Sequence, residues 1–149
     1  MGRTAMYLQL LVRGNGQMVP IAQMILSAGY PFLADKTLRS VYLWYLAATP
    51  ESYLSNFRIP EVRVLPYLLD TAIQVSFQLG FEGRICLHAA FSGTNYDAAL
   101  FSKYVQAGLT PLPANMPLRL TKRNDGRYFI CDNREALALS SKLDYLRQE

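Results

Sequence analysis

A segment in which apolar residues recur with a helical period lies between two apolar segments of strand length. This order constrains the fold more than any other feature of the chain. Residues 41–48 (VYLWYLAA) are rich in β-branched and aromatic side chains, which favours a strand. Apolar residues then recur at intervals of three and four over 66–79, which predicts a helix that ends at Gly80. Residues 84–90 (RICLHAA) form a second short apolar run. Two strands joined by a helix pair in parallel, so we expect 41–48 to lie centrally in the sheet.

The residues before this unit predict an antiparallel hairpin. Apolar side chains dominate 5–13 and 18–28, and residues 14–16 (GNG) tolerate the positive φ of a tight turn. Residues 29–31 (GYP) predict the end of the second strand. The segment 51–59 has neither a helical nor a strand period, and we expect a loop there.

The second half predicts two further helices and a second hairpin. The apolar pattern of 95–107 favours a helix, and residues 118–123 and 127–131 alternate on either side of an Asp-Gly turn. A last helix is expected, with Asp132 or Asn133 as its N-cap. Its apolar face would comprise Ala136, Leu137, Leu143 and Leu146.

The fold class of the whole chain is therefore α+β, in the order hairpin, strand, helix, strand, helix, hairpin, helix.

Composition narrows the function classes. A chain of 149 residues that is 51% hydrophobic fits one domain, 1–149. No apolar stretch approaches the roughly 20 residues that cross a bilayer, and the first residues lack the apolar block of a secretion signal, so we expect a cytoplasmic protein without a membrane partner. The net charge of +4 comes from basic residues interleaved with acids, and we do not expect nucleic acid as a partner. Cys86 and Cys131 lie in apolar segments, which predicts buried thiols and no metal site.

Residues 68–89 (LLDTAIQVSFQLGFEGRICLHA), followed by KYVQAGL at 103–109, resemble the second half of the GNAT superfamily of N-acetyltransferases. In that family a helix leads through a turn of small residues to a strand, and the next helix ends in a Tyr-x-x-x-Gly pattern, which here runs from Tyr104 to Gly108. The resemblance covers about 40–149. It implies a GNAT-like mixed central sheet that lacks the family's usual N-terminal helices.

The resemblance implies transfer of an acetyl group from acetyl-CoA, or another acyl-CoA, to an amine on a small molecule or a protein. Tyr104 stands where the family often places the general acid that protonates the departing thiolate. Glu51 lies just beyond the central strand and is the candidate for the base that deprotonates the amine. Members of the family often form dimers, so a homodimer is expected as well.

The family's loop before the first of these helices follows an Arg/Gln-x-x-Gly-x-Gly/Ala pattern, because only small residues let backbone N–H groups close on a pyrophosphate. The corresponding positions here are Pro60, Arg63 and Leu65, of which the arginine can bind phosphate through its side chain. The resemblance places Ala47, Ala48, Arg63, Val64, Leu65, Pro66 and Tyr67 against the cofactor. Because the glycines are absent, a GNAT-fold binding or regulatory module without chemistry stays open as an alternative.

Three further groups of residues have plain structural interpretations. His88, the single histidine, shares a strand face with Cys86, but two residues apart they are poorly placed as a base and a nucleophile, so a thiol hydrolase is not favoured. The aromatic residues of the central strand, Tyr42, Trp44 and Tyr45, are expected in the core. The basic residues Lys122, Arg123 and Arg127 border the Asp-Gly turn. They fit either a solvated hairpin tip or a site that binds phosphate or nucleic acid.

Overall fold

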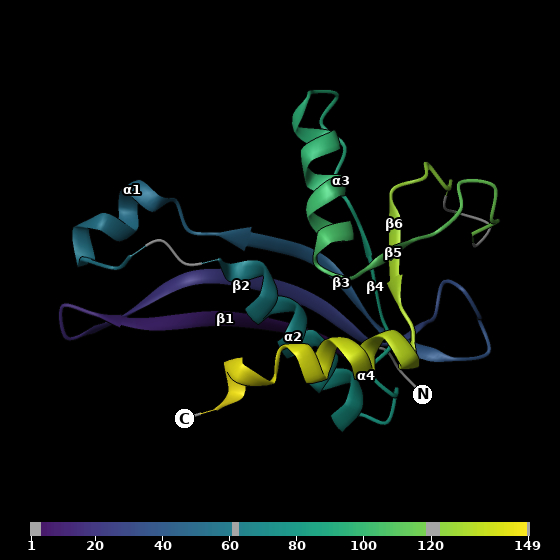
Figure 1. Ribbon diagram of the computed structural model, residues 1–149, viewed down its shortest axis with the longest axis horizontal. Coiled ribbons are helices and arrows are strands. Elements are labelled where there is room, and N and C mark those ends of the chain that lie inside the picture. The colour runs from purple at the N-terminus through teal and green to yellow at the C-terminus, as the bar shows by residue number, and fades with distance from the viewer. Residues whose placement is uncertain (1–3, 61–62, 119–122, 149) are drawn as a thin grey trace.

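The strand–helix–strand unit forms the centre of the molecule (Figure 1). The computed structural model describes residues 4–60, 63–118 and 123–148, and its six strands form one mixed sheet in the order β1-β2-β3-β4-β6-β5. β3 (Arg39–Ala48) and β4 (Ile85–His88) pair in parallel, and α2 (Val64–Gln78) is the crossover between them. The other neighbouring pairs are antiparallel. The α+β class and the central place of the 41–48 segment are therefore confirmed.

The first hairpin is confirmed as well, and it is longer than predicted. β1 (Thr4–Gly14) and β2 (Gln17–Pro31) pair from Thr4 opposite Ala28 to Gly14 opposite Gln17. The remaining elements are α1 (Glu51–Leu54), the 3-10 helix η1 (Ser55–Phe57), α3 (Tyr96–Gln106), β5 (Thr110–Pro111), β6 (Tyr128–Cys131), α4 (Asn133–Lys142) and the 3-10 helix η2 (Asp144–Arg147).

Two predictions for the first half are wrong. The second strand does not break at Gly29, because that residue, at φ 79°, forms an irregularity in the ladder and β2 ends only at Pro31, the last residue of the predicted 29–31 break. The segment 51–59 is not a plain loop, since it contains α1 and η1. A helix of one turn shows no periodicity in sequence, and this one is held by Leu54, which is buried beside Val19 and Ile21.

One prediction for the second half lies mostly outside the described residues, and one is corrected. In the described residues β6 pairs with β4 and β5, and the segment 118–123, predicted as its hairpin partner, includes residues 119–122, which lie outside the described part of the chain. The last helix begins as predicted, with Asp132 and Glu135 forming a capping box. Leu137, however, is 55% exposed and does not belong to the buried face of that helix.

The two faces of the sheet carry separate cores. We call the face covered by α2, α3 and α4 the helical face, and its core includes Leu43, Leu69, Ile73, Leu87, Phe129 and Leu139. On the opposite face, a second cluster comprises Tyr30, Phe32, Leu33, Tyr42, Cys86, Leu112, Tyr128 and Ile130. Alternation along each strand produces this division. Both cysteines are buried as predicted, and burial raises the pKa of Cys131 to about 12. In the described residues, none of the helices combines the length and apolarity that a bilayer crossing requires.

The backbone at Gly83, shortly after α2, lies very close to neighbouring side chains, and this predicts the effect of a substitution on stability. Gly83 has φ 79°, and a Cβ there would lie 2.5 Å from the Ala136 Cβ and 2.7 Å from the Phe77 Cζ. Gly80 has φ 83° with no atom within 4 Å of such a Cβ, so it is the matched control for backbone strain alone. We expect Gly80→Ala to lower the free energy of unfolding by about 1 kcal/mol and Gly83→Ala by at least about 2 kcal/mol more. Urea unfolding of both variants measures this, and equal losses would contradict it.

Candidate functional site

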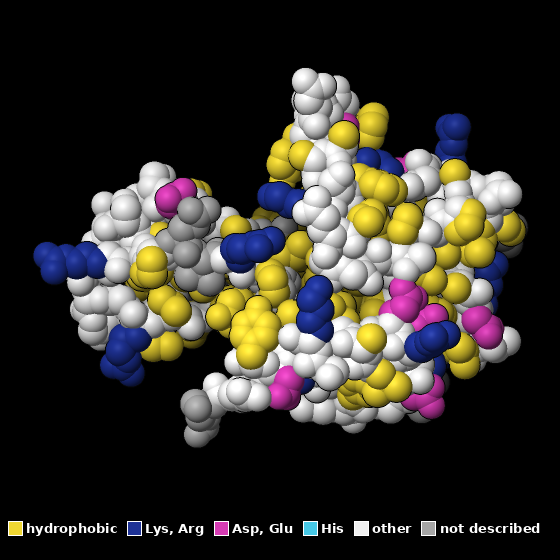
Figure 2. All heavy atoms as spheres, in the orientation of Figure 1, with side chains coloured by type: hydrophobic (Ala, Val, Ile, Leu, Met, Phe, Trp, Pro, Cys, Tyr) yellow, Lys and Arg dark blue, Asp and Glu magenta, His cyan; other side chains and the backbone are white. Residues whose placement is uncertain are grey.

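A pocket of about 770 Å³ lies where the end of β3, the start of α2, the second half of α3 and the end of α4 meet. Leu65, Leu69, Leu139 and Leu143 supply an apolar part of its lining. Figure 2 shows the hollow between these elements, with hydrophobic side chains in it and Lys and Arg side chains around it. The pocket therefore suits a ligand with both apolar and anionic parts.

The pocket follows from the way β3 leaves β4. The two strands pair only from Val41 opposite Ile85 to Leu43 opposite Leu87. β3 then continues beside β2 to Ala48, whereas β4 ends at His88. A parallel pair that separates after three residues leaves space between its strands, and the N-terminus of α2 and the C-terminal half of α3 border that space.

Three cationic side chains from three elements line the pocket. Arg63 immediately precedes α2, Lys103 lies on α3, and Lys142 lies at the end of α4. Among the described residues, none of those that line the pocket is a carboxylate. Cations that converge on one cavity without an opposing acid attract anions, and phosphate groups accept hydrogen bonds from both Arg and Lys.

An ion pair holds the C-terminal wall of the pocket against α2. Asp70, buried in α2, accepts a hydrogen bond from Arg147 of η2, which raises the pKa of the guanidinium. Arg147 also donates to the Ser140 carbonyl at 2.8 Å, and Gln74 donates to the Ser140 hydroxyl at 2.8 Å. These contacts join α2, α4 and η2, and so they position Lys142 and Tyr145 at the pocket.

Tyr104 follows the pocket-lining residue Lys103 in the sequence, but its own side chain is buried in the core. It is 7% exposed, and its ring centroid lies 5.4 Å from that of Phe129. Ala107, one turn further along α3, lines the pocket. Burial raises the pKa of the Tyr104 phenol, so it is protonated at neutral pH. A protonated phenol is the form that a general acid requires.

Two charged side chains fix the loop that leads from β4 into α3. The Asp97 carboxylate accepts hydrogen bonds from the backbone N–H groups of Ser92 and Gly93, each at 2.8 Å. Arg127 donates to the carbonyls of Ala89, Ala90 and Asp97, each at 3.0 Å. Because α3 begins at the end of this loop, Asp97 and Arg127 determine where Lys103 and Tyr104 lie. Arg127 therefore has a structural role at the base of α3.

The structure brings together five of the residues that the family resemblance placed against the cofactor. These are Ala48, Arg63, Val64, Leu65 and Pro66. The residues that line the pocket do not include Ala47, Tyr67, Tyr104 or Glu51. Glu51 is exposed in the first turn of α1, and its role as a base stays a prediction.

Sequence reasoning missed the part of the pocket that α3, α4 and η2 contribute. Lys103, Gln106, Lys142 and Tyr145 line it, although nothing in their local sequence distinguishes them from surface residues. The only signal was the apolar period of the last helix, which places Leu139 and Leu143 on one buried face. Because α2 and α4 are far apart in the sequence, the contribution of α3, α4 and η2 to the same pocket could not be predicted.

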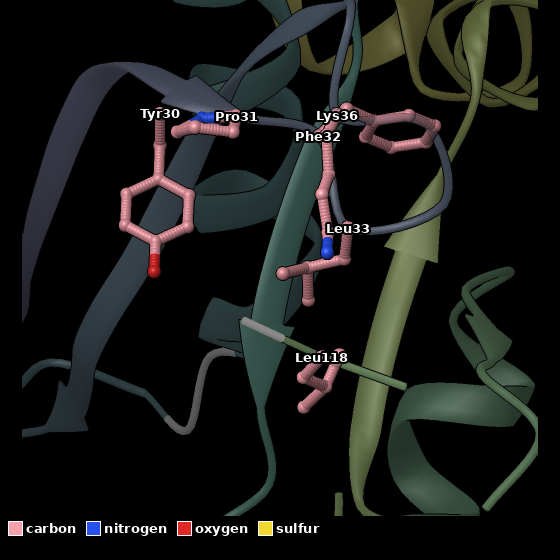
Figure 3. A pocket seen from close by; sticks show the side chains of 6 residues that line it. All are labelled: Tyr30, Pro31, Phe32, Leu33, Lys36 and Leu118. Atoms are coloured by element: carbon pink, nitrogen blue, oxygen red, sulfur yellow. The ribbon is translucent and has the colours of Figure 1, made fainter. Parts of the chain in front are cut away.

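The other chemical candidates, His88 and Cys86, contact different groups. The His88 Nε2 lies 2.8 Å from the Asp125 carboxylate, and the Cys86 thiol lies 3.6 Å from the Ser40 hydroxyl. Neither contact joins the Cys86 side chain to the His88 side chain. Figure 3 shows a niche between Tyr30, Phe32, Leu33, Lys36 and Leu118, and its volume of about 10 Å³ holds no more than a water molecule.

Two of the three aromatic residues of the central strand are not in the core. Tyr42 is buried, but Trp44 is 49% exposed and Tyr45 is 48% exposed. Both lie on the part of β3 after Leu43, which no longer pairs with β4. There, the face of the sheet opposite the helical face carries no helix. The Trp44 indole stacks on Tyr42, with ring centroids 4.3 Å apart, and donates to the Ser27 hydroxyl at 2.7 Å.

Comparison with known proteins identifies the fold. No family model and no curated protein matches the sequence. Among solved structures, the KacTA–DNA complex matches with a TM-score of 0.57 and 11% identity over 95% of this chain and 76% of that one. A tyrosine-to-phenylalanine mutant of KacT matches with a TM-score of 0.52 and 11% identity over 89% of this chain and 74% of that one. KacT is a GNAT-fold toxin acetyltransferase, and the present chain has a GNAT-like fold.

The Asp97 carboxylate generates a prediction about pH. Burial raises the pKa of Asp97, but hydrogen bonds from Ser92 and Gly93 outweigh this effect and hold the pKa below its usual value. A carboxylate whose pKa is lowered by folding stabilises the protein above the pKa of the unfolded chain, about 3.9, and this contribution is lost as the pH falls through the folded-state pKa. We expect Asp97→Asn to be less stable than the wild type at pH 7, with the difference shrinking below about pH 4. Urea unfolding at pH 7 and pH 3 measures it, and a difference independent of pH would contradict it.

Proposed function

We propose that this chain is an acyl-CoA-dependent N-acyltransferase of the GNAT type, which transfers an acetyl group from acetyl-CoA to an amine. The GNAT-like fold, shared with the acetyltransferase KacT, supports this proposal at the level of architecture. The observation that carries it is the pocket of about 770 Å³ at the start of α2, with Arg63, Lys103 and Lys142 in its lining.

The lining of the pocket fits the chemistry of acyl-CoA. The ligand has three phosphate groups and a long, largely apolar arm, and the pocket offers three cations and a leucine-rich wall. At the start of α2, Leu65 replaces the glycine or alanine of the family pattern, and Pro66 has no backbone N–H to donate. Side-chain cations therefore take over much of the phosphate binding that backbone N–H groups provide in the family.

The proposed reaction is direct attack of a neutral amine on the thioester carbonyl. The new C–N bond forms as the C–S bond breaks, the amine loses one proton to a base, and the CoA thiolate gains one. In this proposal Tyr104 donates the proton to the thiolate, since its phenol is protonated at neutral pH. Glu51 remains the candidate base, either directly or through water.

The acceptor is proposed to be an amine on a small molecule or a macromolecule. The sequence alone argued against nucleic acid as a partner, but the structure with the TM-score of 0.57 is a complex with DNA, so this expectation is not supported. We therefore include protein and nucleic-acid partners among those to be tested. A cytoplasmic location remains an expectation from sequence.

Calorimetric titration of acetyl-CoA tests the cofactor proposal. We expect saturable binding that weakens roughly tenfold in Lys103→Ala/Lys142→Ala, because two exposed charge-assisted contacts contribute about 1.4 kcal/mol together. Lys36→Ala/Arg134→Ala removes the same charge outside the pocket and should bind as the wild type does. Absence of binding at millimolar acetyl-CoA, or equal affinities of the two double variants, would count against the proposal.

Substitution of Tyr104 tests the chemistry separately from binding. We expect Tyr104→Phe to bind acetyl-CoA as the wild type does but to lower kcat by about 10²-fold or more, because it keeps the ring that packs on Phe129 and removes the proton donor. Release of free thiol with a panel of amines measures the rate. Tyr96→Phe, which changes an exposed tyrosine of the same helix, is the control. Binding without turnover of any amine would favour the alternative, a binding or regulatory module without chemistry.

A further inference from the structure

A histidine–carboxylate pair lies at the end of β4, where β3 and β4 part. The two strands pair for the last time at Leu43 opposite Leu87, and His88 is the next residue of β4. The His88 Nε2 lies 2.8 Å from a carboxylate oxygen of Asp125, and 31% of the histidine side chain is exposed. Among the described residues, neither member of the pair lines the pocket of about 770 Å³. The pair is therefore a separate, accessible cluster of titratable groups beside the same separation of strands.

The hydrogen bonds of Asp125 determine which nitrogen of His88 is basic. Its Oδ1 accepts from the Arg127 N–H at 3.0 Å, and its Oδ2 faces His88. Burial raises the pKa of Asp125, but these hydrogen bonds outweigh burial and hold the pKa below its usual value, so the carboxyl group is ionised at neutral pH. An ionised carboxylate only accepts, so the Nε2 of a neutral His88 carries the proton and the Nδ1 carries the basic lone pair. A base whose orientation is fixed by a third group has this arrangement.

His88 and Tyr104 lie on opposite faces of the sheet at the same point. Because side chains alternate along β4, Leu87 belongs to the core of the helical face and His88 lies on the opposite face, with its ring centroid 4.5 Å from that of Tyr128. The residue of β6 that pairs with Leu87 is Phe129, and Tyr104 packs on it. A carbonyl group held between the diverging strands would therefore have a proton donor on one side and a proton acceptor on the other.

The other titratable groups on this face are not suited to accept a proton. Tyr42 of β3 and Tyr128 of β6 are buried, and burial raises the pKa of both phenols, so both are protonated at neutral pH. Cys86, on the same side of β4, is completely buried. The two oxygens of Asp125 already accept hydrogen bonds. Among these groups, His88 combines exposure with a basic nitrogen.

We propose that His88, oriented by Asp125, is the base of the acyl transfer, and that the amine approaches from the face of the sheet opposite the helices. This assignment rests on the proposed function, and it places the base on β4 instead of at Glu51. As the C–N bond forms, the His88 Nδ1 takes one proton from the amine nitrogen. As the C–S bond breaks, Tyr104 gives one proton to the sulfur. Each residue then returns to its starting state by exchanging one proton with solvent.

Asp125 is a positioning residue in this assignment. Its carboxylate holds the imidazole ring through Nε2 and favours the imidazolium that forms when Nδ1 is protonated. The same negative charge, beside the Tyr128 ring, attracts the ammonium form in which amines reach the protein. We expect Asp125→Asn to lower kcat less than removal of the imidazole does, with the KM for acetyl-CoA unchanged.

The chain has a single histidine, so proton NMR tests the position of His88 without any turnover. We expect the histidine Hε1 signal of the full chain, at constant pH, to shift as acetyl-CoA is added, with the dissociation constant that calorimetry measures. Adenosine 3′,5′-bisphosphate has the phosphates without the thioester and should leave the signal in place. A signal that does not respond to saturating acetyl-CoA overturns the assignment alone. Absence of calorimetric binding overturns the proposed function, and the assignment with it.

Chemical rescue tests the base itself. We expect His88→Ala to bind acetyl-CoA as the wild type does and to lower kcat by about 10²-fold or more. Added imidazole should restore part of the rate, because it supplies a proton acceptor in the exposed space that the variant leaves. Tyr104→Phe is the matched control, since imidazole cannot replace a proton donor on the other face. His88→Gln is the second variant if the thermal midpoint shows that His88→Ala does not fold, and it should lose the fall in kcat/KM at low pH that protonation of the base causes.

Four results would overturn the assignment while acetyl-CoA still binds. The first is a rate of His88→Ala equal to that of the wild type. The second is a loss of rate that imidazole does not restore in a folded variant, which would give His88 a structural role. The third is a low-pH fall in kcat/KM that disappears in Glu51→Gln and persists in His88→Gln, which would make Glu51 the base. The fourth is binding without turnover of any amine, because no proton is then transferred.

Discussion

The short parallel pairing of β3 with β4 is the constraint on which the rest of the structure depends. Arg84, 7% exposed, aligns the two strands at their start: its Nε donates to the Arg39 carbonyl at 2.9 Å, and its own carbonyl accepts from the Val41 N–H at 3.1 Å. The Ser76 hydroxyl of α2 donates to the same Arg84 carbonyl at 2.9 Å. Strands and crossover helix are thus fixed together at one end, and the strands are left to separate at the other.

The candidate site is built from this separation. Two diverging strands cannot enclose a pocket by themselves, so other elements must form its sides. Here α3 and the α4–η2 segment form them. Each wall is attached through a buried carboxylate that accepts hydrogen bonds, Asp97 for the loop before α3 and Asp70 for η2. Breaking one partner of such a contact leaves a costly buried charge. The rigid placement of Lys103 and Lys142 therefore comes from residues that lie outside the pocket.

The sequence predicted those parts of the fold that depend on local pattern. The period of 66–79 placed α2 within two residues of its observed bounds, and the Asp132 cap marked the start of α4. It could not predict β5, which at two residues has no pattern, or the exposure of Trp44, which depends on where β3 leaves β4. The resemblance found the α2 side of the pocket because that side is contiguous in sequence. Lys142 and Tyr145 required three-dimensional packing.

Trp44 gives the chain an internal optical probe at an informative place. The chain has a single tryptophan, so its fluorescence reports on one position. That position is half-exposed, hydrogen-bonded to Ser27 and stacked on Tyr42, and it lies on β3 immediately after the last residue that pairs with β4. A change in the angle at which the strands part would alter the polarity around the indole and shift its emission. The opening of the sheet can therefore be followed in unlabelled protein.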